Sequence, residues 1–386
     1  MADPSTSPPL TRASVLAARD LIRPYVHHTP VVTNSTLSAL ASTPRTTTNT
    51  PDDDSTKKAA KPTIRFWFKC ENLQRAGAFK VRGAFHALER LVREPGWVEG
   101  GGREKGVVTH SSGNHAQALA LAARTHGIPA HIVMPSISAP PKIAATRGYG
   151  ARVVFSGSTS VEREAETARV VAATGARLVP PYDHPDIVLG QGTLGLELQE
   201  DVLAAQAQQS QNQGKGKGEG KVKGLDAIIT PCGGGGMLSG VALSCEGTGI
   251  RVFGSEPSFQ GADDARRGYE SGVRVEAVSS LTVADGLRTP VGAVPWSVIY
   301  ERRLVAGIYS VSEVEIRRAL RLVYERMKLV VEPSAVVPLA VALYNEDFRA
   351  LVEREAGPEG WDVGIVFSGG NVSLEALGKL FSEEAE

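Results

Sequence analysis

The stretch AIITPCGGGGM, residues 227–237, joins a short β-branched run to a helical pattern through four consecutive glycines. Glycine adopts positive φ at no steric cost, so Gly233, Gly234, Gly235 and Gly236 allow the backbone to turn several N–H groups toward one point. The dipole of the following helix favours negative charge at that point. The stretch therefore predicts a phosphate-binding turn at the carboxyl end of a strand.

The same strand-to-helix rhythm repeats on both sides of this turn. Short β-branched runs, each followed by a helical pattern, lie at 106–109, 131–134, 152–155, 227–230, 251–254 and 364–367. A capping box formed by Ser312 and Glu315 predicts a further helix at the start of the periodic run 316–327. Alternating strands and helices predict an α/β fold with a parallel sheet that is covered on both faces.

Length, charge and cysteine content exclude several classes of protein. The chain has 386 residues, with 42 Lys plus Arg against 42 Asp plus Glu, so it predicts about two domains and no nucleic-acid partner. The longest apolar stretch, 334–344, contains Pro338 and is shorter than the roughly 20 residues of a membrane span. The three cysteines, Cys70, Cys232 and Cys245, fit neither a disulfide framework nor a CxxC zinc site. A reducing, cytoplasmic location is expected.

Two segments lack the apolar residues that a folded core requires. Residues 41–62 are rich in Thr, Ser, Pro and Asp, and residues 205–224 are a run of Gln, Gly and Lys. Such compositions do not offset the entropy of ordering the chain. Both segments are predicted to be surface insertions.

A dinucleotide site competes with the phosphate interpretation of the glycine turn. Gly234, Gly236 and Ser239 approximate the spacing of a Rossmann turn, and Glu256 lies where an acid could bind a ribose. The spacing match is imperfect. A nucleotide-binding module is kept as an alternative from another functional class.

Further motifs in the same order along the chain resemble a known family. They are HTP at 28–30, KCENL at 69–73, GAFKVRGA at 77–84, SSGNH at 111–115, GQGT at 190–193 and SGGNV at 368–372. Together with the glycine turn they resemble the fold-type II pyridoxal-phosphate enzymes, and within them the group of serine racemases and serine/threonine ammonia-lyases. The resemblance runs from about residue 14 to residue 380, apart from the two insertions.

This resemblance implies an architecture like that of the tryptophan synthase beta chain. It predicts two three-layer α/β domains with the cofactor in the cleft between them. The large domain would comprise residues 1–95 and 185–386, and the small domain residues 104–175. A homodimer is also expected, because dimers occur in the family.

The resemblance also implies the residues that hold the cofactor. Lys80 would form a Schiff base with pyridoxal 5'-phosphate and move protons at the substrate Cα, as a deprotonated amine can do. Asn114 would hydrogen-bond the ring hydroxyl, and Ser368 would face the pyridine nitrogen. The remaining cofactor contacts would come from Phe79 against the ring and from Gly233, Gly234, Gly235, Gly236 and Met237 around the phosphate.

For the substrate, the resemblance assigns the SSGNH turn to the carboxylate of an amino acid. Ser111, Ser112, Asn114 and His115 would bind it. Ser112 would also lie across the cofactor plane from Lys80, so that each residue serves one face of Cα and racemisation becomes feasible. An alternative is that Ser112 only binds the carboxylate.

A divalent cation site is the last feature that the resemblance implies. Glu256, Asp264 and the carbonyl of Ala262 would bind Mg or Ca, since hard cations prefer oxygen ligands. The segment 256–264 is about two residues longer than in typical racemases, so the position of the carbonyl ligand stays open. An alternative is that Asp263 or Asp264 caps the next helix.

The activity expected from the resemblance is a serine racemase that also has L-serine and L-threonine ammonia-lyase activity. A dedicated threonine or 3-hydroxyaspartate ammonia-lyase without racemisation is an alternative. A β-replacement enzyme of the cysteine synthase kind is disfavoured, because the turn at 111–115 reads SSGNH and not Thr-Ser-Gly-Asn-Thr. The sequence leaves open the ratio of racemisation to elimination, the preferred substrate, nucleotide activation and the pathway.

Overall fold

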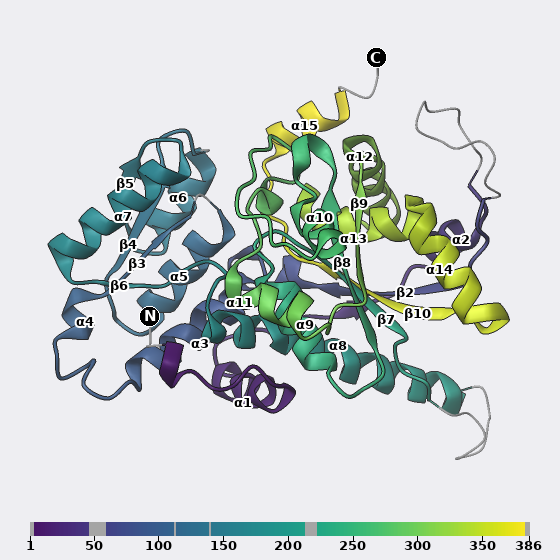
Figure 1. The fold of residues 1–386 in the computed structure, drawn as a ribbon, viewed down its shortest axis with the longest axis horizontal. Helices are drawn as coiled ribbons and strands as arrows, with labels where there is room; N and C mark the ends of the chain where they lie inside the picture. Colours follow the sequence, from purple (N-terminus) through teal and green to yellow (C-terminus); the bar gives the residue numbers. More distant parts are fainter. Residues whose placement is uncertain (1–3, 46–58, 112, 139, 213–221, 383–386) are drawn as a thin grey trace.

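Two separate sheets organise the chain (Figure 1). The computed structural model describes residues 4–45, 59–111, 113–138, 140–212 and 222–382. The larger sheet has six strands in the order β1-β2-β10-β7-β8-β9, and all neighbours are parallel except the antiparallel pair β1 and β2. Its strands are β1 (Val31–Val32), β2 (Ile64–Cys70), β7 (Ala227–Pro231), β8 (Arg251–Pro257), β9 (Gly307–Val311) and β10 (Trp361–Phe367).

The smaller sheet has four parallel strands in the order β5-β4-β3-β6. They are β3 (Val107–His110), β4 (Ala130–Pro135), β5 (Arg152–Ser156) and β6 (Arg177–Leu178). All six β-branched runs predicted from sequence are strands, whereas the two-residue strands β1 and β6 are too short to leave a periodic pattern. β6 lies just beyond residue 175, the expected end of the small domain, and the exact domain boundaries stay a prediction.

Helices cover both faces of the six-stranded sheet, as the α/β pattern predicts. Along β2 the side chains alternate between the faces, so Phe66 and Phe68 belong to one core and Trp67 to the other. The first core is closed by α2 (Ser35–Ser42), α12 (Glu313–Leu322), α13 (Pro333–Tyr344), α14 (Glu346–Ala356) and α15 (Leu374–Ser382). The second is closed by α1 (Arg12–Ile22), α8 (Pro185–Asn212) and α9 (Gly236–Cys245).

The smaller sheet has its own helices and a separate core (Figure 1). These helices are α4 (Gly102–Lys105), α5 (Asn114–Thr125), α6 (Pro140–Gly148) and α7 (Ser160–Thr174). Helix α3 (Lys80–Val92) contacts both α5 and α8 and so joins the two parts of the molecule. Two short helices, α10 (Asp264–Ser271) and α11 (Ala293–Trp296), follow β8.

The GQGT motif brings α8 into backbone contact with two other helices. A Cβ on Gly190 would lie 2.7 Å from the carbonyl oxygen of Arg82 in α3, and a Cβ on Gly192 would lie 2.4 Å from the carbonyl oxygen of Gly240 in α9. The amide N–H of Gly83 donates to Oε1 of Gln191 across the first contact. These contacts fix the helix that carries Lys80 against the large sheet.

The structure corrects part of the prediction that residues 41–62 and 205–224 are irregular surface insertions. Helix α8 continues to residue 212, so residues 205–212 are helical rather than irregular. Alanine and glutamine are good helix formers and extend a helix that is already anchored by its buried first half. Of the segment 41–62, residues 41–42 complete α2, and residues 46–58 lie outside the described residues, as do residues 213–221.

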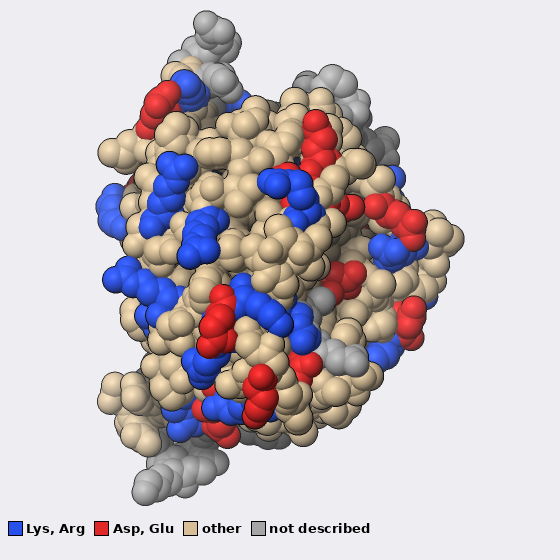
Figure 2. All heavy atoms as spheres, turned by 90° about the vertical axis from the view of Figure 1, so that its left-hand side faces the viewer, with Lys and Arg blue, Asp and Glu red and all other residues tan. Residues whose placement is uncertain are grey.

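The predicted helix after Ser312 is confirmed. Ser312 and Glu315 form the reciprocal capping box at the start of α12, and a π-helical turn continues it to Met327. Within the described residues, no helix has the length and apolar character needed to cross a membrane. Figure 2 shows one face of the molecule, on which Lys and Arg side chains lie among Asp and Glu side chains.

Candidate active site

The glycine turn Gly233–Gly236 connects β7 to α9 and has no room for side chains. A Cβ on Gly234 would lie 2.3 Å from Cγ of Tyr182, and one on Gly235 would lie 2.8 Å from Cβ of Pro295. Gly235 also has φ +82°, which disfavours any residue with a Cβ. The turn ends at the N-terminus of α9, where backbone N–H groups and the helix dipole favour an anion.

Lys80 is the first residue of α3. Its Nζ donates a hydrogen bond of 2.8 Å to the carbonyl oxygen of Pro181. Burial lowers the pKa of Lys80 to about 8, although the charge of Glu332 acts in the opposite direction. This lowered pKa gives Lys80 a larger fraction of the free amine at neutral pH than an ordinary lysine has, and a nucleophile or a base requires the free amine.

The segment before Lys80 is attached to the turn that follows β10. The backbone N–H of Phe79 donates to the carbonyl oxygen of Ser368 at 3.0 Å, and Ala78 forms an isolated β-bridge with Gly369. Both Phe79 and Ser368 are buried. Residues almost 290 positions apart in sequence are thus held side by side.

The SSGNH turn follows β3 and leads into α5, as predicted. The amide N–H of Gly113 donates to Oγ of Ser111, and the ring of His115 hydrogen-bonds the carbonyl oxygen of Val179. Burial lowers the pKa of His115 to about 3, so its ring is neutral at physiological pH. Ser112 lies outside the described residues.

Asn114 contacts two residues that lie across the site from it. Its Nδ2 donates to Oε1 of Glu332 at 2.8 Å, and its Oδ1 accepts from Nδ2 of Asn371 at 2.8 Å. Glu332 is 4% exposed and precedes Pro333, the first residue of α13. The sequence reasoning missed Glu332, although an acid directly before a helix-starting proline at 332–333 is visible in the sequence.

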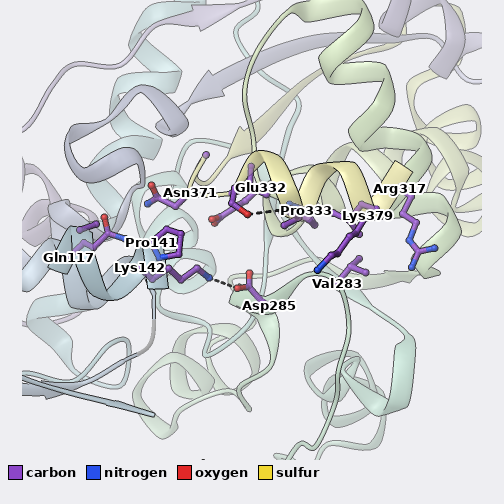
Figure 3. A pocket seen from close by; sticks show the side chains of 16 residues that line it. Gln117, Pro141, Lys142, Val283, Asp285, Arg317, Glu332, Pro333, Asn371 and Lys379 are labelled. Carbon is purple, nitrogen blue, oxygen red and sulfur yellow. Dashed lines mark hydrogen bonds and ion pairs between the residues drawn. The ribbon is translucent and has the colours of Figure 1, made fainter. Parts of the chain in front are cut away.

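A cavity of about 550 Å³ adjoins this group (Figure 3). The side chains of Gln117, Glu332 and Asn371 line one end of it. Lys142 of α6 pairs across the cavity with Asp285, which belongs to the 3-10 turn Asp285–Leu287. The cavity therefore lies between the helices of the smaller sheet and those of the larger sheet.

Tyr182 is a second residue that the sequence reasoning did not single out. Its ring packs directly on the backbone of Gly234, and it follows Pro181, the partner of Lys80. Burial raises the pKa of the Tyr182 hydroxyl, and the nearby charge of Arg163 acts against this rise. Tyr182 thus packs on the glycine turn, and the residue before it accepts the hydrogen bond from Lys80.

Two of the predicted cation ligands, Glu256 and Asp264, are buried carboxylates near the start of α10. Glu256 and Asp264 are both buried, and burial raises the pKa of Asp264 to about 7 and that of Glu256 well above its usual range. Glu256 accepts from the backbone N–H groups of Ala265 and Arg266 at the start of α10. Among the described residues, no group of three or more His, Cys, Asp or Glu side chains converges on one point.

Ala262 and the two aspartates after it have different surroundings. Ala262 is fully buried, directly after the 3-10 turn Phe259–Gly261. Asp263 forms ion pairs with Arg266 and Arg267, whereas Oδ1 of Asp264 is buried without a hydrogen-bond partner. Neither aspartate caps α10 through its own side chain, and the helix is instead capped by Glu256. Of the two aspartates, Asp264 is the one with a carboxylate oxygen that lacks a hydrogen-bond partner and could bind a cation.

Comparisons with known proteins agree with this geometry. A family model described as pyridoxal-phosphate dependent enzyme matches residues 45–369. The serine racemase of Arabidopsis thaliana is 37% identical over 370 residues, which cover 95% of each chain. The L-threo-3-hydroxyaspartate ammonia-lyase of Saccharomyces cerevisiae is 37% identical over 375 residues, which cover 96% of each chain. The solved structure of maize serine racemase matches with a TM-score of 0.78 and 35% identity, over 97% of this chain and 98% of that one.

These likenesses confirm the predicted fold-type II α/β class and the prediction of an enzyme. They do not favour the alternative of a nucleotide-binding module. The glycine turn, which a Cβ would fill, and the low-pKa Lys80 fit the phosphate and the aldehyde of the cofactor. By its sequence and its fold, the chain belongs to the family of pyridoxal-phosphate dependent enzymes.

Proposed function

We propose that the protein is a serine racemase that also has L-serine and L-threonine ammonia-lyase activity. The observation that carries the proposal concerns Lys80. Burial lowers the pKa of its amine to about 8, and the amine binds the carbonyl oxygen of Pro181, the residue before Tyr182, which packs on the glycine turn. Relatives that cover nearly the whole chain include both serine racemases and ammonia-lyases, which supports both activities.

The proposed cofactor is pyridoxal 5'-phosphate, which, when bound, withdraws electrons from Cα and so makes its proton acidic. The backbone N–H groups of Gly233–Gly236, followed by Met237, would hold its phosphate. Asn114 would bind its ring hydroxyl, Ser368 would face the ring nitrogen, and Phe79 would pack against the ring.

The chain's own residues would then divide the proton transfers. Lys80 Nζ would take the proton from Cα of L-serine, whose carboxylate Ser111, Asn114 and His115 would hold. Ser112 would return a proton to the opposite face and so give D-serine. Loss of the β-hydroxyl instead of reprotonation would give pyruvate and ammonia after hydrolysis.

Replacing Ser112 with alanine separates these two outcomes. We expect Ser112→Ala to reduce D-serine formation by about 10²-fold or more, because a positioned proton donor contributes about 10²–10⁴-fold. L-serine elimination should survive in part, because Lys80 alone serves that branch. Chiral chromatography of the products, together with a pyruvate assay, measures both.

The matched control is Ser136→Ala, an exposed serine directly after β4. This control should leave both activities at the wild-type level. Equal retention of racemisation and elimination in Ser112→Ala would contradict the assignment of one residue to each face of Cα.

A 3-hydroxyaspartate ammonia-lyase is the second candidate function. Arg163 in α7 acts electrostatically on both His110, at the end of β3, and Tyr182, so its charge lies near the substrate side of the site. A guanidinium is suited to a second substrate carboxylate. Comparing the turnover of L-serine, L-threonine and 3-hydroxyaspartate decides between the candidates, and a strong preference for the dicarboxylate without D-amino-acid product would favour the lyase.

We further propose a divalent cation, Mg or Ca, bound by Glu256, Asp264 and the carbonyl of Ala262. Burial raises the pKa of both carboxylates, and the charge of Asp264 raises that of Glu256 further, so a cation bound between them would offset the cost of ionising them. The buried, unpartnered Oδ1 of Asp264 supports this proposal.

Magnesium is accordingly expected to stabilise the folded protein. At a concentration of about 100 times the dissociation constant, linkage gives about 2.7 kcal/mol. Urea unfolding with and without Mg should show this increase in the free energy of unfolding for wild type, and no increase for Glu256→Gln. The glutamine keeps an acceptor for the N-terminus of α10. Glu270→Gln, an exposed position on α10, is the control. An equal response of Glu256→Gln and wild type would contradict the site.

The remaining parts of the proposal rest on the sequence. They are the domain division into residues 1–95 with 185–386 and residues 104–175, a homodimer, and a cytoplasmic location.

A further inference from the structure

Glu332 is held rigidly between two turns of the candidate site. Its backbone N–H donates to the carbonyl oxygen of Gly369 at 3.0 Å. Its carboxylate lies so close to the same glycine that a Cβ on Gly369 would be 2.8 Å from Oε1. Glu332 is 4% exposed, so its carboxylate depends on protein groups rather than on water for its hydrogen bonds. The side chain of Asn114 donates to this carboxylate, and the backbone of Asn371 hydrogen-bonds it as well.

The donors and acceptors of the hydrogen bonds between Asn371, Asn114 and Glu332 can be assigned in only one way. Nδ2 of Asn371 donates to the backbone carbonyl of Ala76 at 2.8 Å, and a carbonyl can only accept. This contact fixes the amide of Asn371, whose Nδ2 also donates to Oδ1 of Asn114. Because Oδ1 is occupied in this way, Nδ2 of Asn114 points to Glu332. Asn114 therefore keeps one N–H for a further acceptor.

Charged groups from three other elements face Glu332. Burial, followed by the charge of Asp285, raises the pKa of Glu332 to about 7. Lys142 of α6 and the hydrogen bond from Asn114 act in the opposite direction. Glu332 in turn raises the pKa of Lys80 in α3. Figure 3 shows Glu332, Lys142 and Asp285 around the same cavity.

We propose that Glu332 is a positioning residue that, in its ionised form, holds Asn114 so that the remaining N–H of Asn114 points at the ring hydroxyl of the cofactor. This inference rests on the proposed role of Asn114 and extends it to a residue that does not itself touch the cofactor. An ionised carboxylate is the stronger acceptor, since charge-assisted hydrogen bonds are roughly twice as strong as neutral ones. Protonation of Glu332 weakens the hold on Asn114.

The pH dependence follows from this. Above a pH of about 7 Glu332 is ionised, and the donor faces the cofactor. Below it Glu332 gains a proton, the Asn114 amide is less firmly held, and the electronic absorption of the bound cofactor shifts. The acidic limb of the kcat profile falls in the same range.

The test compares Glu332→Gln and Glu332→Ala with wild type by absorption spectra of the cofactor-loaded protein between pH 5.5 and 9, values chosen to bracket the pKa of about 7. Glu332→Ala removes the acceptor, so we expect a changed cofactor spectrum and a kcat reduced roughly tenfold or more, the usual effect of losing a hydrogen bond to a charged group. Glu332→Gln keeps an acceptor without a titrating group. It should restore most of the spectrum and lose the transition near pH 7.

Glu375→Gln is the matched control, because it removes an exposed carboxylate from the neighbouring helix α15. It should retain the wild-type spectrum and pH profile. A wild-type spectrum in Glu332→Ala, or an unchanged transition near pH 7 in Glu332→Gln, would overturn the inference. If Glu332→Ala fails to fold, the pH profile of Glu332→Gln decides alone. The spectra are recorded without any amino acid, so they test Glu332 whether or not L-serine is the substrate.

Discussion

Lys80→Ala is expected to abolish turnover of L-serine and to remove the covalent attachment of the cofactor. General base catalysis alone contributes about 10²–10⁴-fold, and the variant also loses the nucleophile, so the decrease in kcat should exceed about 10⁴-fold. Borohydride reduction followed by peptide mass spectrometry should find the cofactor on residue 80 in wild type and on no lysine in the variant.

The expected size of this effect follows from the surroundings of the amine. Burial lowers the pKa of Lys80 from 10.5 to about 8, so about one molecule in ten carries a free amine at pH 7. The fraction rises as the pH approaches 8, and attachment of the cofactor should become faster in the same range. Lys80→Arg retains a positive charge but has no amine that loses its proton, so it should be as inactive as Lys80→Ala.

Lys105→Ala is the matched control, since Lys105 is exposed and, within the described residues, its Nζ donates a hydrogen bond to the carbonyl oxygen of Gly100. It should keep the cofactor and the activity. Cofactor on a different lysine, or substantial turnover by Lys80→Ala, would contradict the assignment of Lys80.

Much of the fold could be predicted because its signals are local. Each β-branched run and the Ser312 capping box depend on neighbours within a few residues, and all of them were found where the sequence placed them. The antiparallel strand β1 depends on its pairing with β2, more than 30 residues away, and has no pattern of its own. The helical residues 205–212 depend on the buried half of α8, which composition alone does not describe.

The candidate site could be predicted where a residue type belongs to a motif. Lys80 and the glycine turn stand in such motifs, and in the structure Lys80 contacts Pro181 while the turn contacts the next residue, Tyr182. Glu332 and Tyr182 could not be predicted, because their roles arise from contacts with residues that are distant in sequence, Asn114 for Glu332 and Gly234 for Tyr182. The same is true of Arg82, which lies only two residues after Lys80. Its ion-pair partners cannot be inferred from the residues around it in the sequence.

Arg82 is fully buried and is paired with two carboxylates from different elements. Its guanidinium binds both carboxylate oxygens of Glu71 at 2.7 and 2.8 Å, and both of Glu197 at 2.8 and 2.7 Å. Lys69, also fully buried, adds an ion pair of 2.8 Å to Glu197. The network ties the first turn of α3 to β2 and α8, so it holds the helix on which Lys80 begins.

Arg82→Met is therefore expected to lower the free energy of unfolding by about 3–5 kcal/mol, the usual cost of removing one partner from a buried ion pair. Denaturant unfolding of the cofactor-free protein measures the loss. Arg169→Met, which removes an exposed arginine and its ion pair with Glu166, should change the unfolding midpoint far less. A loss in Arg82→Met no larger than in this control would contradict the structural role of the network.

The pH dependence of this difference separates charge from packing. Burial by itself raises the pKa of Glu197, but the charges of Arg82 and Lys69 outweigh it and hold the pKa at about 2. Glu197 therefore stabilises the wild type fully above its ordinary pKa of 4.5, and the contribution is lost as the pH falls from there toward 2. In Arg82→Met the buried carboxylates lose their guanidinium and take up protons more readily. The difference in stability should be largest at neutral pH and narrow on acidification, whereas a loss of packing alone would give the same difference at every pH.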